Sequence, residues 1–225
     1  MSGHILAIGG GDVVSPSSRL DDYLLELSGK QRPRIGYLPT AAGERPEGIQ
    51  WFYDAFTGRE CEPSHLELFG MPERPWEWVL AQDVVYVCGG NTANALALWR
   101  LHGVDRALRE LWERGGVLGG WSAGGICWFE DGVTDSFGPA LRALDDGLGF
   151  LSGSFCPHYD GEAERRPTFT RLVADGALPA GLAADDDAAI LFEGRELREV
   201  VSQREGARGY RVTADGEQPL EPRLL

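Results

Sequence analysis

A serine set between glycines is the residue of this sequence that is best placed to do chemistry. The segment Gly120-Trp121-Ser122-Ala123-Gly124 matches the pattern G-x-S-x-G and follows the apolar residues Val117 and Leu118. Such a segment is typical of a sharp turn from a strand into a helix, which exposes the serine hydroxyl and frees the next backbone N–H. Ser122 is therefore a candidate nucleophile, and the Ala123 N–H is a candidate donor to an oxyanion. The same pattern also arises where a serine only caps a helix.

A nucleophilic serine needs a base, and histidine is the usual one because its pKa lies near neutrality. Of the four histidines, only His158 follows Ser122, and it stands after Pro157 at the end of a strand-like segment. A side chain in that position can project into a cleft. His158 is therefore the candidate base.

The third group of such a site is a carboxylate that orients the imidazole. We assign this role to Asp135, which lies in the polar turn Thr134-Asp135-Ser136 between Ser122 and His158. The flanking hydroxyls can hydrogen-bond the carboxylate and keep it ionised. Three other acids compete for the role: Glu130, Asp131 and Asp160.

A second glycine turn, Gly89-Gly90, follows the strand predicted over residues 83–88 and precedes a helix over 93–101. Turns of this kind lie at the carboxyl edge of an α/β sheet, where ligands bind. We expect the Gly90 N–H to be the second oxyanion donor. Asn91 or Thr92 at the start of the helix also fits the simpler role of a cap.

The elements that position these residues follow from apolar periodicity. Strands are predicted over residues 4–8, 34–40, 61–68, 83–88, 117–121, 188–192, 199–202 and 210–213, besides the segment that ends at His158. Helices are predicted over residues 19–27, 47–56, 76–81, 93–101, 104–114 and 162–174, with Trp51, Phe52, Ala55 and Phe56 facing the core. This alternation predicts an α/β fold with a single doubly wound, mostly parallel sheet and a small antiparallel C-terminal edge. We expect residues 1–225 to form one domain.

Composition narrows the possible partners. The chain carries 21 basic and 35 acidic residues, a net charge of -14, which argues against binding to nucleic acid or an anionic membrane. The four cysteines show no metal-ligand spacing, so we expect no metal and no cofactor. The sequence shows no leader and no membrane-spanning run, and we expect a cytoplasmic protein, monomeric or homodimeric.

Three segments together carry a resemblance. Gly89-Gly90-Asn91-Thr92, the segment around Ser122, and Pro157-His158 resemble the signatures of the serine peptidase family that contains peptidase E (aspartyl dipeptidase) and cyanophycinase. The resemblance spans about the first three quarters of the chain. It implies a fold related to class I glutamine amidotransferases, with Ser122 as nucleophile, His158 as base, and the N–H groups of Gly90 and Ala123 as the oxyanion hole.

The sequence departs from this family in two places. Asp135 falls nearer the serine than the family's aspartate, and an ungapped match puts Phe137 there. In peptidase E an arginine within Glu-Thr-Arg is thought to hold the substrate's N-terminal aspartate, whereas this chain reads Glu-Ala-Glu-Arg-Arg-Pro over residues 162–167. The candidates for substrate binding are Asn91, Arg165 and Arg166. We expect a peptidase for short peptides without strict specificity for an N-terminal aspartate.

Other interpretations remain open. An esterase of the α/β-hydrolase type shares the elbow but places its histidine after the last strands, where this chain has none. A non-catalytic binding module could keep the elbow as an anion-binding turn. A glutamine amidotransferase would need a cysteine at the elbow, and Cys127 lies five residues beyond Ser122.

Overall fold

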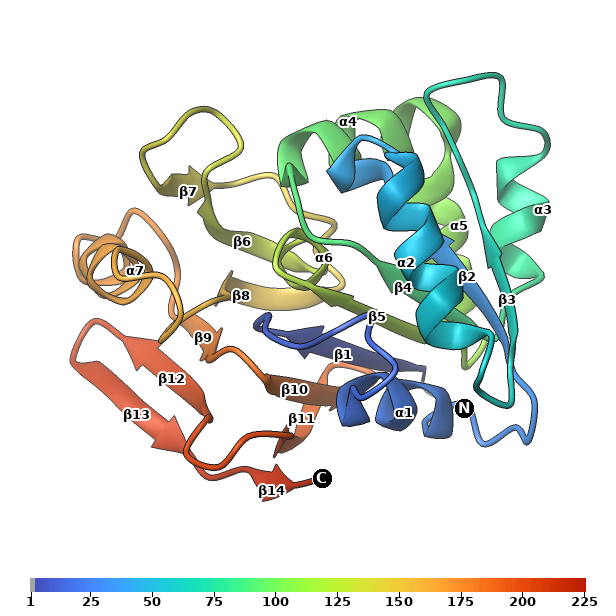
Figure 1. Ribbon diagram of the computed structural model, residues 1–225. Coiled ribbons are helices and arrows are strands. Elements are labelled where there is room, and N and C mark those ends of the chain that lie inside the picture. Colours follow the sequence, from blue (N-terminus) through green and yellow to red (C-terminus); the bar gives the residue numbers. More distant parts are fainter. Residues whose placement is uncertain (1–2) are drawn as a thin grey trace.

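The computed structural model describes residues 3–225, and within that range the strands form two sheets (Figure 1). The larger sheet has the order β14-β11-β10-β1-β5-β4-β2-β3. Its strands are β1 (His4–Ile8), β2 (Arg34–Leu38), β3 (Glu62–His65), β4 (Val84–Val87), β5 (Val117–Trp121), β10 (Ala188–Glu193), β11 (Glu196–Ser202) and β14 (Arg223–Leu224). Five neighbouring strands of this sheet are mutually parallel: β1, β5, β4, β2 and β3. Strand β10 runs antiparallel to β1.

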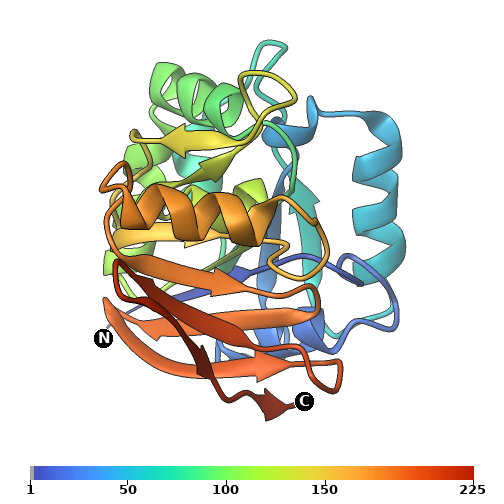
Figure 2. The same ribbon diagram turned by 90° about the vertical axis from the view of Figure 1, so that its left-hand side faces the viewer.

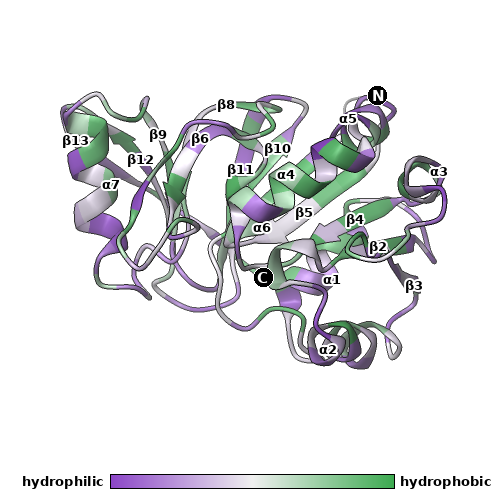
Figure 3. Cartoon of the chain, turned by 90° about the horizontal axis from the view of Figure 1, so that it is seen from above, coloured by the Kyte–Doolittle hydropathy of each residue, from purple (hydrophilic) through white to green (hydrophobic). Residues whose placement is uncertain are grey.

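Helices cover both faces of the larger sheet. Figure 3 shows α4 and α5 on one side of it and α1 and α2 on the other. The helices are α1 (Arg19–Glu26), α2 (Pro46–Phe56), α3 (Pro75–Leu80), α4 (Thr92–His102), α5 (Val104–Glu113), α6 (Ala123–Ile126) and α7 (Arg165–Ala174), with a 3-10 turn η1 (Thr40–Ala42). The predicted α/β class with a doubly wound sheet is therefore confirmed.

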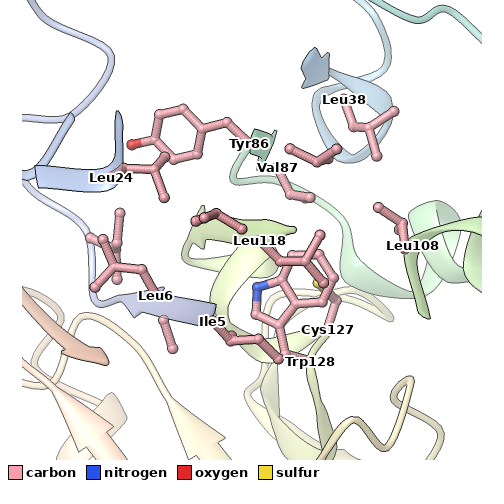
Figure 4. Packing of buried hydrophobic residues seen from close by; sticks show 14 of the residues in the cluster. Ile5, Leu6, Leu24, Leu38, Tyr86, Val87, Leu108, Leu118, Cys127 and Trp128 are labelled. Atoms are coloured by element: carbon pink, nitrogen blue, oxygen red, sulfur yellow. The ribbon is translucent and has the colours of Figure 1, made fainter. Parts of the chain in front are cut away.

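The core lies between these helices and the apolar strands. Leu6 of β1, Val87 of β4 and Leu118 of β5 are fully buried, as Figure 4 shows from close by. Helix α1 packs so closely on β5 that a Cβ at Gly119 would lie 2.5 Å from a Leu24 methyl group. This close packing holds the strand that carries Ser122 rigidly in the centre of the sheet.

One core prediction is wrong. Phe52, Ala55 and Phe56 of α2 are buried, but Trp51 is 66% exposed. Residues i, i+3 and i+4 share one helix face, and each step of one residue turns the side chain by about 100°. Trp51 therefore projects beside the buried stripe instead of lying within it.

The smaller sheet was not predicted. Within residues 3–225 it has the order β13-β12-β9-β8-β6-β7. Its strands are β6 (Phe129–Thr134), β7 (Arg142–Leu144), β8 (Leu151–Cys156), β9 (Gly181–Ala184), β12 (Gly209–Thr213) and β13 (Gly216–Leu220). Helix α7 lies over this sheet (Figure 2). Phe169, Leu172 and Val173 of α7 form a second buried cluster with residues of the sheet.

The expectation of a single sheet with an antiparallel edge made by residues 199–202 and 210–213 is thus corrected. Strand β11 pairs with β10 in the larger sheet, whereas β12 pairs with β9 and β13 in the smaller one. Apolar periodicity identifies a strand but not its partner. Strand β6 was also hidden, because Glu130, Asp131 and Gly132 interrupt its apolar pattern.

The topology gathers several loops at one edge of the larger sheet. Strands β1, β4 and β5 are parallel, so their carboxyl ends lie together, with Ile8 opposite Trp121. Because β10 is antiparallel to β1, with Ala189 opposite Ile8, the turn that precedes β10 reaches the same edge. Within residues 3–225 the structure has no helix that is both long and apolar enough to cross a membrane.

Candidate active site

Ser122 occupies the expected strand-turn-helix junction between β5 and α6. Its backbone is strained, with φ of 54° and ψ of -115°, a conformation that non-glycine residues rarely adopt. Its N–H donates a 3.2 Å hydrogen bond to the Ile8 carbonyl at the end of β1. The turn is too tight for a side chain at Gly120, where a Cβ would lie 2.5 Å from the Gly124 carbonyl oxygen. The sequence pattern is thus explained by close backbone packing.

The Gly89-Gly90 turn lies beside this serine. A Cβ at Gly89 would be 3.3 Å from the Ser122 Cβ, and one at Gly90 would be 2.2 Å from the Ala41 carbonyl oxygen. Gly90 has φ of 133°, which only glycine adopts freely. Within residues 3–225, neither the Gly90 N–H nor the Ala123 N–H donates to another protein group. Both N–H groups are free to donate to a ligand.

His158 reaches the same edge from the smaller sheet, just after β8. Its N–H donates a 3.3 Å hydrogen bond to the Gly9 carbonyl. Gly9 directly follows Ile8, so Ser122 and His158 are fixed to consecutive carbonyl groups of one extended segment. The His158 backbone is itself in the left-handed region, with φ of 52°. The backbones of the predicted nucleophile and base are thus both anchored at the end of β1.

Asp186 is the acid that contacts the histidine. Its Oδ1 lies 2.7 Å from His158 Nδ1, and both side chains are partly buried. Asp135, in contrast, is 56% exposed, and its charged neighbour is Arg165, 4.0 Å away. The structure therefore contradicts the expected contact between Asp135 and His158. The reason is that the turn from 134 to 136 binds the start of α4, through a hydrogen bond from the Ala93 N–H to Ser136 Oγ.

The Asp186 carboxylate fits a slot formed by two glycines. A Cβ at Gly10 would lie 2.4 Å from Asp186 Oδ1 and 2.2 Å from the His158 ring. A Cβ at Gly161 would lie 1.9 Å from Asp186 Oδ2. Only glycine at both positions leaves room for the carboxylate beside the imidazole.

The other acids considered for this role lie elsewhere. Glu130 Oε2 accepts a 2.9 Å hydrogen bond from the Gly153 N–H, and Asp131 lies in β6, where burial raises its pKa. Asp160 does not touch the imidazole, but its Oδ1 accepts a 2.8 Å hydrogen bond from the Asp186 N–H. Asp160 therefore acts on Asp186 and not on His158.

The sequence contained a signal for Asp186 that was not used. Asp185, Asp186 and Asp187 directly precede the apolar strand β10. A short acidic run is typical of solvated surface, and nothing in the sequence shows that β10 pairs antiparallel with β1. That pairing is what brings the run to the catalytic edge.

The three candidates for substrate binding are all engaged within the protein. Asn91 caps α4 by accepting from the Asn94 N–H, and its Nδ2 donates to the Ser136 carbonyl. Arg165 is 2% exposed, and it donates to Glu162 and to the Val133 carbonyl. Arg166 pairs with Glu217 and lies over the rings of Tyr159 and Tyr210. Arg165 is thus shielded from a substrate, and Arg166 is already paired with a carboxylate of the protein.

A carboxylate instead lies near the reactive face of the histidine. Glu162 Oε1 is 4.0 Å from His158 Nε2, while its Oε2 accepts a 2.7 Å hydrogen bond from Arg165 Nε. Asp135 faces the same arginine from the other side. The charged group beside His158 Nε2 is therefore the Glu162 carboxylate, which is also paired with Arg165.

No cysteine here is arranged as a nucleophile. The four cysteines are buried, and burial raises the pKa of the Cys127 thiol well above its ordinary value. An activated cysteine needs a lowered pKa and some exposure. Within residues 3–225, no three histidine, cysteine or acidic side chains are grouped to hold a metal ion.

Comparisons with known structures show the fold. A crystal structure of a peptidase from an acI-B1 Actinobacterium aligns with a TM-score of 0.72 at 18% identity, over 99% of this chain and 95% of that one. A structure titled "Putative Peptidase E Protein" from Listeria monocytogenes EGD-e aligns with a TM-score of 0.64 at 17% identity, over 91% of this chain and 100% of that one. The expected peptidase E-like fold is confirmed.

Sequence comparison adds the family. The chain is 51% identical over 211 residues to the uncharacterized peptidase YgaJ of Bacillus subtilis (strain 168). The alignment covers 92% of this chain and 91% of that one. The model of peptidase family S51 matches residues 5–200, which include Ser122, His158 and Asp186. The chain therefore belongs to peptidase family S51 and is a serine-type peptidase.

Proposed function

We propose that this protein hydrolyses short peptides with Ser122 as nucleophile, His158 as general base and Asp186 as the acid that orients the base. The observation that carries this proposal is the 2.7 Å contact between Asp186 Oδ1 and His158 Nδ1. A carboxylate at Nδ1 fixes the proton on that nitrogen and leaves Nε2 free to accept one. The anchoring of Ser122 and His158 to the consecutive carbonyls of Ile8 and Gly9 supports the same assignment.

The reaction would follow from these positions. His158 Nε2 takes the proton of the Ser122 hydroxyl as Oγ attacks the scissile carbonyl, and the Gly90 and Ala123 N–H groups donate to the resulting oxyanion. His158 then protonates the leaving amine. Water, activated by His158, hydrolyses the acyl-enzyme. Asp186 stabilises the imidazolium that forms in both halves of the reaction.

The charges near the site bear on the substrate. Recognition of an N-terminal aspartate needs a free cation, yet Arg165 is buried against Glu162 and Arg166 is bound to Glu217. The carboxylate of Glu162 lies 4.0 Å from His158 Nε2. We therefore propose a substrate range of neutral or basic short peptides.

A covalent probe combined with a peptide screen tests the proposal. A fluorophosphonate should label wild-type protein at Ser122, located by peptide mapping, and Ser122→Ala should lose both labelling and hydrolysis. Removal of such a nucleophile commonly lowers the rate by several orders of magnitude. The thermal unfolding temperature of Ser122→Ala should stay close to that of wild type, which rules out misfolding as the cause. Wild-type protein that neither reacts with the probe nor cleaves any di- or tripeptide would overturn the proposal.

A further inference from the structure

Four carboxylates lie around the turn that delivers Asp186 to His158. Asp185, Asp186 and Asp187 are consecutive between β9 and β10, and Asp160 approaches from the loop after β8. Like charges at this distance repel, and such a turn would open without a compensating cation. Asp185 is held separately, since its carboxylate accepts from the Arg208 N–H and the Tyr210 hydroxyl. The carboxylates of Asp160 and Asp187 both pair with one arginine, which also binds the main-chain carbonyl of Asp186.

Arg204 is that arginine, and it comes from the connection between β11 and β12. Its Nη2 donates to Asp160 Oδ2 at 2.5 Å and to the Asp186 carbonyl at 2.9 Å. Its Nε donates to Asp187 Oδ2 at 3.1 Å. The planar guanidinium is suited to this task because it presents several donors in one fixed arrangement.

Asp160 also holds the backbone of Asp186 in place. The Asp160 carboxylate accepts the Asp186 N–H through Oδ1 and binds Arg204 through Oδ2. The Asp186 carbonyl binds the same guanidinium. The backbone of Asp186 is thus held at its N–H by an acid and at its carbonyl by a base, and these two are paired with each other.

We propose that Arg204 and Asp160 are positioning residues, which fix the backbone of Asp186 so that its carboxylate meets His158 Nδ1. They act through Asp186 and do not touch the reacting atoms. This inference rests on the proposed function, since it concerns how the proposed acid is held. The two glycines of the slot restrict the carboxylate, while Arg204 and Asp160 restrict the main chain that carries it.

Hydrogen bonds of Asp187, the residue that follows Asp186, also hold this turn in place. Asp187 has φ of 66°, its N–H donates to the Gly10 carbonyl, and its Oδ1 accepts from the Asp12 N–H and from Gln203. Burial raises the pKa of Asp187, but the hydrogen bonds from Gln203, Asp12 and Arg204 outweigh it, so that its pKa lies below the ordinary value. The acid next to Asp186 therefore stays charged and bound to Arg204 at neutral pH.

The test measures the rate at which a fluorophosphonate labels Ser122, which needs no knowledge of the substrate. Arg204→Gln should slow labelling about tenfold or more, because small displacements of a catalytic group cost up to about a hundredfold. Arg204→Lys keeps one charge and should recover part of the rate. The deciding measurement is the double variant: Arg204→Gln should cost little further when Asp186 is already Asn. An arginine that only stabilises the fold would lower the rate by the same factor in both backgrounds, and that result would overturn the inference.

Controls separate the possible failures. Arg208→Gln, four residues away with its side chain on Glu221, should label at the wild-type rate. If Arg204→Gln does not fold, Asp160→Asn decides: it keeps an oxygen for the Asp186 N–H but loses the ion pair, and an unchanged labelling rate would overturn the inference. Labelling of wild type with an unaffected Arg204→Gln would disprove the positioning role and leave the proposed function standing. If the probe does not label the wild-type protein, both the positioning role and the proposed function are disproved.

Discussion

The Tyr86 hydroxyl donates a 2.8 Å hydrogen bond to Asp21 Oδ1 beneath the strand that carries the nucleophile. Asp21 is fully buried at the start of α1, and Tyr86 in turn packs edge-on against Trp121, with ring centroids 5.1 Å apart. Burial raises the pKa of Asp21 from 3.8 to about 6, although the hydrogen bond from Tyr86 opposes the rise. A carboxyl group with a pKa of about 6 is thus linked through Tyr86 to Trp121, the residue that precedes Ser122.

The first prediction concerns pH and stability. A raised folded-state pKa means that the ionised form of Asp21 is disfavoured in the folded protein, so its contribution to stability is complete below about pH 3.8 and is lost as the pH rises through 6. A shift of about two units corresponds to about 3 kcal/mol. The unfolding free energy of Asp21→Asn, relative to wild type, should therefore rise by about that amount between pH 4 and pH 7.

Chemical denaturation at several pH values measures this difference. Acids with lowered pKa values, such as Asp83 and Glu217, affect both proteins equally and cancel. Tyr86→Phe removes the hydrogen bond that lowers the pKa of Asp21, so it should shift the loss of stability to higher pH. Parallel curves for wild type and Asp21→Asn would contradict the assignment.

The second prediction compares two acids. Asp186→Asn should lower kcat by roughly a hundredfold or more, because the imidazole loses the group that fixes its tautomer and orientation. Asp135→Asn should change kcat less than about threefold, since its carboxylate is exposed and lies 4.0 Å from Arg165. Steady-state kinetics on one cleaved peptide, with the unfolding temperature of each variant as control, gives the answer. A larger loss for Asp135→Asn than for Asp186→Asn would restore the original assignment.

The third prediction concerns the glycine slot. In Gly161→Ala the new methyl group would lie 1.9 Å from Asp186 Oδ2, so the carboxylate must move. Labelling of Ser122 and peptide hydrolysis should both fall roughly 10- to 100-fold. Gly48→Ala is the matched control, because Gly48 lies in α2 with nothing within 4 Å of the added Cβ. It should keep full activity and gain about 0.5–1 kcal/mol of stability. Equal activities of the two variants would refute the slot.

The fourth prediction concerns specificity. Dipeptides with an acidic first residue should be cleaved with a lower kcat/KM than their alanine counterparts, because the Glu162 carboxylate lies 4.0 Å from His158 Nε2. Each exposed like-charge contact is worth up to about 1 kcal/mol, or about fivefold. Glu162→Gln should reduce the discrimination by about that factor, with little change for the alanine peptide. Preference of the wild type for an N-terminal aspartate would show that this charge argument is wrong.

Much of the larger sheet could be predicted from the sequence. Residues 84–87 and 117–121 are continuous apolar strands, and glycine turns mark their ends, so their position in a buried parallel sheet follows from pattern alone. Pro167 is compatible with the predicted helix because it occupies the first turn of α7, where its missing N–H breaks no hydrogen bond within the helix. The smaller sheet could not be predicted, because partners of short polar strands such as β6 are set by long-range packing.

The residues of the site also differ in how far the sequence predicts them. The elbow around Ser122 is encoded locally, since its glycines are required by contacts within a few residues. His158 could be found by elimination among four histidines. Asp186 could not be found in this way, because its position depends on the antiparallel pairing of β10 with β1. That pairing joins residues more than 180 positions apart in the sequence, such as His4 and Glu193. Local patterns favoured Asp135, which stands nearer in sequence but lies in a turn that is held to the start of α4 through Ser136.

The placement of β10 beside β1 has a consequence for the order in which the chain becomes active during synthesis. Until residues 188–193 have left the ribosome, one edge of β1 has no partner and the turn with Asp186 does not exist. Arg204 emerges later still. A nascent chain can therefore present Ser122 on its finished strand while His158 has no acid to orient it. On the proposed assignment, full peptidase activity requires that the chain has been synthesised beyond Arg204.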